Sequence, residues 1–331
     1  MSETLQPALD PHAFAQSELE LAEKMIFEAC HSQVAAVSVG AAHVMRAGGK
    51  RLRPLVLILA AKACGYGGAE RSARLGAAVE LIHTATLVHD DVVDESDTRR
   101  GQDAVNTFFG NEASVLMGDY LVCRALRMIA EESDLELMRS ICDVIVSMCE
   151  AEVLQITYRG DLENTFDNYF RVIRNKTACL FSFTARAGAH LGHASAAVRE
   201  RLALFGLNLG TAFQIVDDIL DLTGIEEELG KPTAADLREG KFTFPVLHAI
   251  RHAEGRDRES LLHLLGDPPR LSDAQVDEVI DLVRTAGGFQ AAYDCASEYA
   301  ERALDALSGL SDGPALQGLR SVTARVVERR Y

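Results

Sequence analysis

Two short clusters of aspartates are the residues in this sequence best suited to do chemistry. The clusters share one spacing and read Asp90-Asp91-Val92-Val93-Asp94 and Asp217-Asp218-Ile219-Leu220-Asp221. At about 100° per residue, the three carboxylates of each cluster project from one face of a helix within one turn. Like charges at a helix C-terminus repel one another and oppose the macrodipole, so a cation must offset them. Because hard oxygen ligands suit Mg²⁺, we predict that all six aspartates bind magnesium together with substrate phosphates.

The alternative for each cluster is a solvated helix end that binds nothing. A single cluster would favour that alternative. Here the pattern occurs twice, and each copy follows an apolar helical stretch, 75–88 and 202–216. Acids at the tips of two buried helices indicate the mouth of a shared cavity. We therefore prefer a metal site to an exposed acidic face.

Basic residues lie near both clusters in the sequence and predict binding of a diphosphate. They are Lys50, Arg51 and Arg53 before a helix start, Arg99 and Arg100 after the first cluster, and Lys176, Lys231 and Lys241 around the second. Arginine forks and lysine point charges hold phosphates, and a helix start also favours anions. Arg51 stands between two better candidates and is interpreted as a surface charge.

His83 lies two turns before Asp90 and within roughly 20° of it on the helical wheel, so we predict a phosphate contact, whereas His89 is interpreted as structural.

The elements that must position these residues are helices, because apolar residues recur at i, i+3 and i+4 almost throughout. We predict helices near 12–46, 54–64, 70–94, 111–131, 134–158, 166–191, 196–222, 242–253, 257–265, 272–286, 288–308 and 313–329. Nothing in the sequence resembles a linker or a repeat. We therefore predict one all-α domain over residues 1–331, a single large bundle of about ten or more helices around a central cavity. The polar stretch 223–243, which carries glycines and lysines, is predicted to be a lid or binding loop.

Composition excludes some classes of function. Acidic residues outnumber basic residues 49 to 33, and the net charge of -16 argues against a general nucleic-acid-binding protein. The seven cysteines are scattered without a CxxC pair, so they are interpreted as reduced thiols rather than zinc ligands. The N-terminus lacks the basic and apolar regions of a signal peptide, and we expect a soluble, cytoplasmic protein.

Taken together and in order, these motifs resemble the trans-isoprenyl diphosphate synthase family, and most of all its long-chain, octaprenyl-type members. The stretches that carry the resemblance are GGKRLRP (48–54), ELIHTATLVHDDVVDESDTRRG (80–101), NKT (175–177), FQIVDDILD (213–221) and GKPTAADLREGKFTFP (230–245). The similarity covers essentially the whole chain. It implies an all-helical fold, a homodimer, and Mg²⁺ dependence with three ions when substrate is bound. It also implies two substrates, isopentenyl diphosphate and an allylic diphosphate such as farnesyl diphosphate.

The resemblance implies a role for each matching residue. Through magnesium, the six aspartates would bind the allylic diphosphate. Direct contacts to that diphosphate would come from Arg99, Lys176, Lys231 and Lys241, and contacts to isopentenyl diphosphate from Lys50, Arg53, His83 and Arg100. Thr177 and Gln214 would line the reacting centre, with Gln155 nearby. The residues expected to be catalytic are Asp90, Asp91, Asp94, Lys176, Thr177, Gln214, Asp217 and Lys231. The family often has glycine where Ala234 stands. The sequence therefore does not determine the backbone conformation of the predicted lid at this position.

Ala85 and Thr86 precede the first cluster by one turn and bear on product length. Short-chain members of the family often carry an aromatic residue at one or both positions, which forms the floor of the product tunnel. Thr86 lies roughly 40° from Asp90 on the wheel and is predicted to line the tunnel, whereas the role of Ala85 rests on the resemblance. Small residues here favour an all-trans product of about C40, within about C30 to C50, for quinone side chains, and its apolar tail favours transient membrane association on release.

Other readings remain open from the sequence. A floor deeper in the tunnel would give a C15 or C20 product. A terpene cyclase would also ionise an allylic diphosphate, but it does not need a second diphosphate site. A non-catalytic partner subunit of a heteromeric synthase tends to lose acidic motifs that are intact here. A Ca²⁺-binding or structural helical protein would explain the aspartates but leave the lysines and arginines unexplained.

Overall fold

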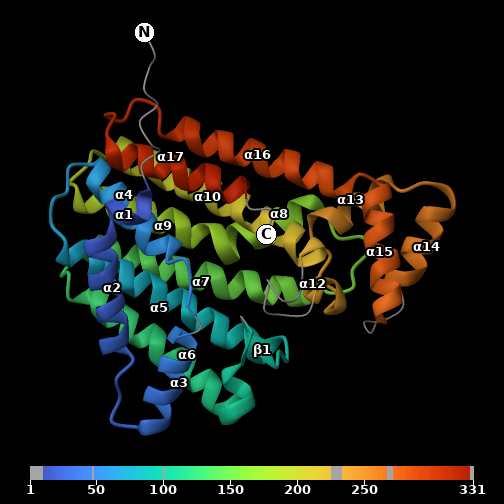
Figure 1. The fold of residues 1–331 in the computed structure, drawn as a ribbon, viewed down its shortest axis with the longest axis horizontal. Helices are drawn as coiled ribbons and strands as arrows, with labels where there is room; N and C mark the ends of the chain where they lie inside the picture. The colour runs from blue at the N-terminus through green and yellow to red at the C-terminus, as the bar shows by residue number, and fades with distance from the viewer. Residues whose placement is uncertain (1–9, 47, 100, 225–232, 267–270, 329–331) are drawn as a thin grey trace.

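The computed structural model describes residues 10–46, 48–99, 101–224, 233–266 and 271–328, and within them the chain is almost entirely helical (Figure 1). This confirms the predicted all-α class. The helices are α1 (Pro11–Phe14), α2 (Gln16–Ala29), α3 (Ala35–Arg46), α4 (Leu52–Ala63), α5 (Glu70–Val93), α6 (Val105–Ala130), α7 (Leu135–Thr157), α8 (Phe166–Ile173), the π-helical turn η1 (Arg174–Ala178), α9 (Cys179–Leu191), α10 (Ala196–Thr223), α12 (Ala235–Arg238), α13 (Phe244–His252), α14 (Gly255–Gly266), α15 (Asp273–Thr285), α16 (Gly288–Ala306) and α17 (Pro314–Val327). A short antiparallel hairpin, β1 (Thr98–Arg99) and β2 (Gln102–Asp103), lies between α5 and α6.

The centre of the bundle is built from α4, α5, α9 and α10. Every residue of α4 from Leu55 to Ala61 is fully buried, because this helix packs against α5, α9 and α17. In Figure 1, α16 and α17 lie along one long side of the molecule, and α13, α14 and α15 gather at one end. Of the described helices, α10 alone is long and apolar enough to cross a membrane, but 67% of its apolar window is buried inside the protein. Packing against α9 and α16 therefore accounts for its hydrophobicity.

Two glycines of α10 let this helix approach α9 and η1 very closely. A Cβ atom at Gly206 would lie 2.2 Å from a backbone oxygen of α9, and one at Gly210 would lie 2.6 Å from the Cα atom of Ala178. A side chain at either position would force the helices apart in an interior that is already close-packed. The close approach brings Thr177 within hydrogen-bond distance of Gln214, one turn beyond Gly210.

The structure differs from the predicted helix boundaries in several places. The helix predicted over 12–46 is three helices, because the chain turns between α2 and α3, where the Ser32 amide donates to the Ser38 hydroxyl at 2.8 Å. The helix predicted over 166–191 is interrupted by η1. The helix predicted from residue 111 begins earlier, at Val105, and bends at Gly110, where φ is 77°. Inside the loop predicted over 223–243, the described part contains the short helix α12.

Candidate active site

A cavity of about 1450 Å³ lies among α5, α7, η1 and α10, and it gathers most of the predicted site residues. The predicted residues that line it are Lys50, Arg53, His83, Thr86, Asp90, Asp94, Arg99, Gln155, Lys176, Thr177, Gln214, Asp217, Asp218 and Lys241. Ala85, Asp91 and Asp221 do not line it. Arg100 and Lys231 lie outside the residues that the structure describes, so the contacts predicted for them stay predictions.

Along one face of α5, the residues that line the cavity change from charged to apolar. Ile82, Thr86, Asp90 and Asp94 are spaced four residues apart, so they share one helix face, and all four line the cavity. At 1.5 Å per residue, Ile82 lies about 12 Å from Asp90 along the helix axis. The far wall continues the apolar end with Val122 and Cys123 of α6 and Ile145, Met148 and Cys149 of α7. The cavity therefore suits a ligand with an anionic head and a long apolar tail.

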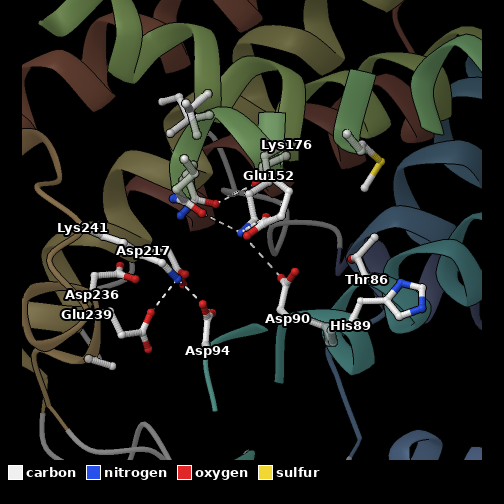
Figure 2. A pocket seen from close by; sticks show the side chains of 18 of the residues that line it. Thr86, His89, Asp90, Asp94, Glu152, Lys176, Asp217, Asp236, Glu239 and Lys241 are labelled. Carbon is white, nitrogen blue, oxygen red and sulfur yellow. Dashed lines mark hydrogen bonds and ion pairs between the residues drawn. The ribbon is translucent and has the colours of Figure 1, made fainter. Parts of the chain in front are cut away.

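Cations from distant parts of the chain hold Asp90 and Asp94. The ammonium of Lys176 lies 3.7 Å from Asp90, and that of Lys241 lies 2.8 Å from Asp94. Arg159 makes a second ion pair with Asp94 at 2.7 Å. Figure 2 shows Lys176 and Lys241 reaching toward these two carboxylates from opposite sides of the cavity.

These ion pairs set the protonation of the first cluster. Burial raises the pKa of Asp94, but Lys241, Lys176 and Arg159 outweigh burial, and the pKa is lowered overall. Burial raises the pKa of Asp90, and Lys176 offsets only part of that effect. Burial lowers the pKa of both lysines, yet neighbouring carboxylates raise each above its ordinary value. Both lysines are therefore charged at neutral pH and available to bind an anion.

Asp91 turns away from the cavity, which differs from the prediction that all three carboxylates of its cluster share one face. Its side chain is buried and accepts two charge-assisted contacts from Arg99, at 2.7 Å from Nε and 2.5 Å from Nη2. Consecutive helical residues point about 100° apart, so the wheel alone placed Asp91 at the margin of that face. Arg99 lines the cavity and presents its positive charge to it, and the ion pair with Asp91 holds the Arg99 side chain in place.

In the second cluster, Asp218 is held by two neutral hydrogen-bond donors. Asp218 is 3% exposed, and its two carboxylate oxygens accept from the Tyr169 hydroxyl at 2.6 Å and the Gln214 amide at 2.9 Å. Burial, together with Asp236 and Asp217, raises the pKa of Asp218 well above its usual range. Asp217 also lines the cavity, and Figure 2 draws its side chain among those of the cavity wall.

Asp221 is also buried and anchors the segment that follows α10. Its carboxylate accepts from the backbone amide of Asp236 at 3.1 Å, and its carbonyl accepts from the amide of Ala234 at 2.7 Å. Ala234 adopts φ 54°, in the left-handed region that favours glycine. That geometry explains why glycine would suit this position, and it answers the question that the sequence left open.

The basic stretch before α4 divides its residues between the cavity and the core. Lys50 and Arg53 line the cavity with His83, as predicted for a second anion site. Arg51 does not fit its interpretation as a surface charge, because its side chain is only 12% exposed and makes 3.0 Å ion pairs with Glu23 and Glu80. This buried bridge fixes the loop that presents its two neighbours.

The two residues predicted to control product length have different surroundings. Ala85 of α5 is fully buried in the packed core. Thr86 lines the cavity, and its hydroxyl donates to the carbonyl of His83 at 2.7 Å. His89 contacts a backbone carbonyl of α6 at 3.1 Å and also lines the cavity, where Figure 2 shows it beside Thr86, so its interpretation as structural stays a prediction.

Several polar residues of the site were missed from the sequence. Glu152 lies 2.5 Å from Lys176, and Glu239 lies 2.6 Å from Lys241, so each lysine bridges two acids. Arg159, Tyr169 and Asp236 also face the predicted residues, as described above. Asp236 sits within the GKPTAAD stretch, where its position next to a lysine-bearing motif could have marked it. Glu239 lies in the same GKPTAADLREGKFTFP stretch (230–245), whereas the sequence around Glu152, Arg159 and Tyr169 gives no sign of what these residues meet in space.

The donor set fits magnesium only when further oxygen ligands take part. Among the described residues, no three acidic, histidine or cysteine side chains converge closely enough to hold an ion by themselves. Asp90, Asp94 and Asp217 nevertheless all line the cavity. Mg²⁺ commonly binds through one or two carboxylates and completes its shell with water and substrate phosphates. The chemistry of these residues therefore suits Mg²⁺ bound together with a diphosphate.

Comparison with known proteins agrees with this site. The polyprenyl synthetase family model matches residues 36–283, so the chain belongs to the polyprenyl synthetase family. Members of this family are prenyltransferases, and the same activity holds for this chain.

The relatives cover nearly the full length of the chain. The octaprenyl diphosphate synthase of Haemophilus influenzae is 36% identical, over 96% of this chain and 95% of that protein. An all-trans-nonaprenyl-diphosphate synthase (geranyl-diphosphate specific) of Rhodobacter capsulatus is 37% identical, over 93% of each. Among solved structures, a polyprenyl synthase of Caulobacter crescentus, complexed with calcium and isoprenyl diphosphate, superposes with a TM-score of 0.94 at 35% identity, over 98% of this chain and 100% of that one.

Proposed function

We propose that this prenyltransferase joins isopentenyl diphosphate to an allylic diphosphate, head to tail, and repeats the step to give an all-trans polyprenyl diphosphate of about C40, whose long tail gains from apolar surroundings. The observation that carries the proposal is the polarity of the cavity. Its charged end holds Asp90 and Asp94, and the same stripe of α5 leads through Thr86 to Ile82. The octaprenyl and nonaprenyl products in the names of the relatives support a long chain.

Two anions need two basic groups, and the cavity provides them. Lys176, Lys241 and Arg99 lie beside the aspartates and would hold the allylic diphosphate. Lys50 and Arg53 line the cavity with His83 and would hold isopentenyl diphosphate. By resemblance, Lys231 joins the first group and Arg100 the second. This double anion site favours a synthase over a terpene cyclase, which needs only one diphosphate.

We propose that Asp90, Asp94 and Asp217 are direct magnesium ligands, whereas Asp91, Asp218 and Asp221 support the site through the contacts described above. Three ions in the substrate-bound state follow from the resemblance. When bound, the metal neutralises charge that develops on the departing diphosphate. Lys176 and Lys241 add fixed positive charge at the same end of the cavity.

The reaction then follows from charge. The allylic C–O bond breaks with both electrons leaving on the diphosphate, which the basic residues stabilise. The π electrons of isopentenyl diphosphate form the new C–C bond with the resulting allylic cation. The adduct loses one proton to regenerate an alkene, and the released diphosphate accepts that proton. Water must be excluded because it would trap the cation as an alcohol. We propose that the segment 223–243 supplies this closure.

An apolar stripe on α7 supports a homodimer. Its members are Cys142, Val146, Cys149, Val153 and Ile156, all exposed and spaced three or four residues apart, and Cys149 borders both this stripe and the cavity. A stripe with this spacing matches the seam of packed helices. A second copy related by a twofold axis would cover it. We further propose that residues 1–331 act as one cytoplasmic domain, and that the long product is released at a membrane.

The test is incubation of purified protein with farnesyl diphosphate, labelled isopentenyl diphosphate and Mg²⁺, followed by chromatography of the extracted lipid. The expected result is a ladder of products ending near C40, because each added unit finds apolar surface in the tunnel. Thr86→Phe should shorten the ladder while the first addition keeps its rate, since the residue lies below the charged end. A wild-type ladder that stops at C15 or C20 would overturn the long-chain proposal. The absence of any incorporation by the folded protein would overturn the synthase proposal.

A further inference from the structure

The loop that presents Lys50 and Arg53 to the cavity has a strained backbone at Arg51. The φ angle of Arg51 is 45°, in the left-handed region, which is unfavourable for a residue with a Cβ atom. A conformation of this kind persists only when the contacts around it fix it, and it is typical of functional sites. The peptide that joins Lys50 to Arg51 therefore needs support from its neighbours.

One support comes from inside the protein. The Arg51 guanidinium makes the ion pairs with Glu23 and Glu80 and also donates to the carbonyl of Met45 at 3.3 Å. These contacts hold the Arg51 side chain, whereas the peptide before it is a separate group. A donor that holds this peptide must come from another part of the chain.

That donor is His12, which lies 38 residues before Lys50 in the sequence. Its Nε2 atom is 3.0 Å from the carbonyl oxygen of Lys50. Because a carbonyl only accepts, Nε2 carries the hydrogen and donates it. The bond fixes the plane of the peptide between Lys50 and Arg51. It thereby sets the direction in which the long, flexible Lys50 side chain leaves the backbone.

His12 is held in this place by its packed neighbours. It belongs to α1, which contacts α4 and α17 and lies beside both in Figure 1. Pro11 and Ala15 of this segment are buried, whereas His12 is half-buried. Asp10 accepts from the His12 amide at 3.4 Å and pairs with Arg325 of α17 at 3.2 Å. The imidazole thus reaches the loop from a fixed base.

We infer that His12 is a positioning residue for isopentenyl diphosphate, because its bond to the Lys50 carbonyl orients Lys50 in the second anion site. The inference rests on the proposed function, in which Lys50, Arg53 and His83 hold that substrate. The contact acts on the loop before α4 and not on the aspartate clusters. Its removal should therefore weaken the binding of one substrate and spare the other.

Steady-state condensation by His12→Ala tests the inference, with each substrate varied at a saturating level of the other. The KM for isopentenyl diphosphate should rise about fivefold, as expected for one hydrogen bond, while kcat and the KM for the allylic diphosphate stay unchanged. His12→Gln should restore the wild-type KM, because the glutamine amide is also a donor. In a Lys50→Ala background, His12→Ala should have no further effect, because it acts through Lys50.

His252→Ala provides the matched control. Nδ1 of His252 lies 2.9 Å from the carbonyl of His248 within α13, so the control also removes a contact between an imidazole and a backbone carbonyl. It should leave kcat and both KM values unchanged. The inference would be overturned by an equal rise of both KM values in His12→Ala, by a rise that His12→Gln does not reverse, by no rise at all, or by additive losses with Lys50→Ala.

Calorimetric titration with isopentenyl diphosphate separates this inference from the proposed function. Without Mg²⁺ and allylic substrate, the Kd of His12→Ala should be about fivefold above that of wild type. Wild-type protein that binds isopentenyl diphosphate but condenses nothing would overturn the proposed synthase, and the ratio of the two Kd values would still decide the role of His12. Wild-type protein that binds none would overturn both.

Discussion

Asp91 and Asp94 of the first aspartate cluster, at the end of α5, pair with cations, whereas Asp218 of the second cluster, on α10, is held by two neutral donors. Lys241 and Arg159 pair with Asp94, and Arg99 pairs with Asp91. In the second cluster, Tyr169 and Gln214 hold Asp218. The sequence pattern is the same in both, yet the partners come from different helices. Identical spacing therefore fixes which carboxylates share a helix turn, and the packed neighbours decide what each one does.

The largest test of this comparison removes one carboxylate from each cluster at the cavity. Asp94→Asn and Asp217→Asn should each lower kcat about a thousandfold, because each removes a negative ligand from the site of charge development. Asp221→Asn should stay within about threefold, since the amide oxygen can still accept from the backbone of α12. The measurement is steady-state condensation at saturating Mg²⁺. Equal losses of kcat in all three variants would show that the aspartates of both clusters are equivalent metal ligands.

A smaller effect separates the middle residues of the two clusters. Asp91→Asn should raise KM for the allylic diphosphate about tenfold with a modest change in kcat, because Arg99 loses the carboxylate that holds it. Asp218→Asn should instead lower kcat and leave that KM unchanged. Varying the allylic substrate at fixed isopentenyl diphosphate measures both. If Asp91→Asn changed kcat and left KM for the allylic diphosphate unchanged, the proposed difference between Asp91 and Asp218 would be contradicted.

The smallest expected effect is a difference in stability across pH. The pKa of Asp218 is raised by burial, so above about pH 4 its ionisation favours the unfolded chain, and stability falls as pH rises toward the folded pKa. Asp218→Asn removes this slope, and its Tm relative to wild type should rise between pH 5 and 8 by about 2 °C.

Asp94 gives the opposite sign and serves as the control. Its pKa is lowered overall, so its stabilisation is present above its unfolded value and lost only as pH falls through the lowered folded value. The Tm difference between Asp94→Asn and wild type should therefore stay constant between pH 5 and 8. A slope for Asp94→Asn that matched the Asp218→Asn slope would contradict the difference between the clusters.

The sequence predicted the fold class and much of the site for a physical reason. Helical periodicity and repeated aspartates are local patterns, so 3.6 residues per turn could place Asp90, Asp94 and Thr86 on one face. Arg51 and Asp91 were interpreted less well, because their partners, Glu80 and Arg99, meet them only after the chain folds. The π-helical turn at Arg174–Ala178 is likewise set by packing against α7 and α10. Residues such as Arg159 carried no local signal at all.

The ion pairs of Lys176 with Asp90 and of Lys241 with Asp94 have a consequence for the resting enzyme. Before substrate arrives, each lysine serves as a provisional counter-ion, so the cavity does not hold bare carboxylates at close range. On the proposed function, Asp90 and Asp94 would hold the metal of an arriving diphosphate, and Lys176 and Lys241 would bind its phosphate oxygens. Each charged group would then leave one opposite charge for another, so little new desolvation would be needed. The strongly charged centre would stay in balance through a cycle that repeats on one growing chain.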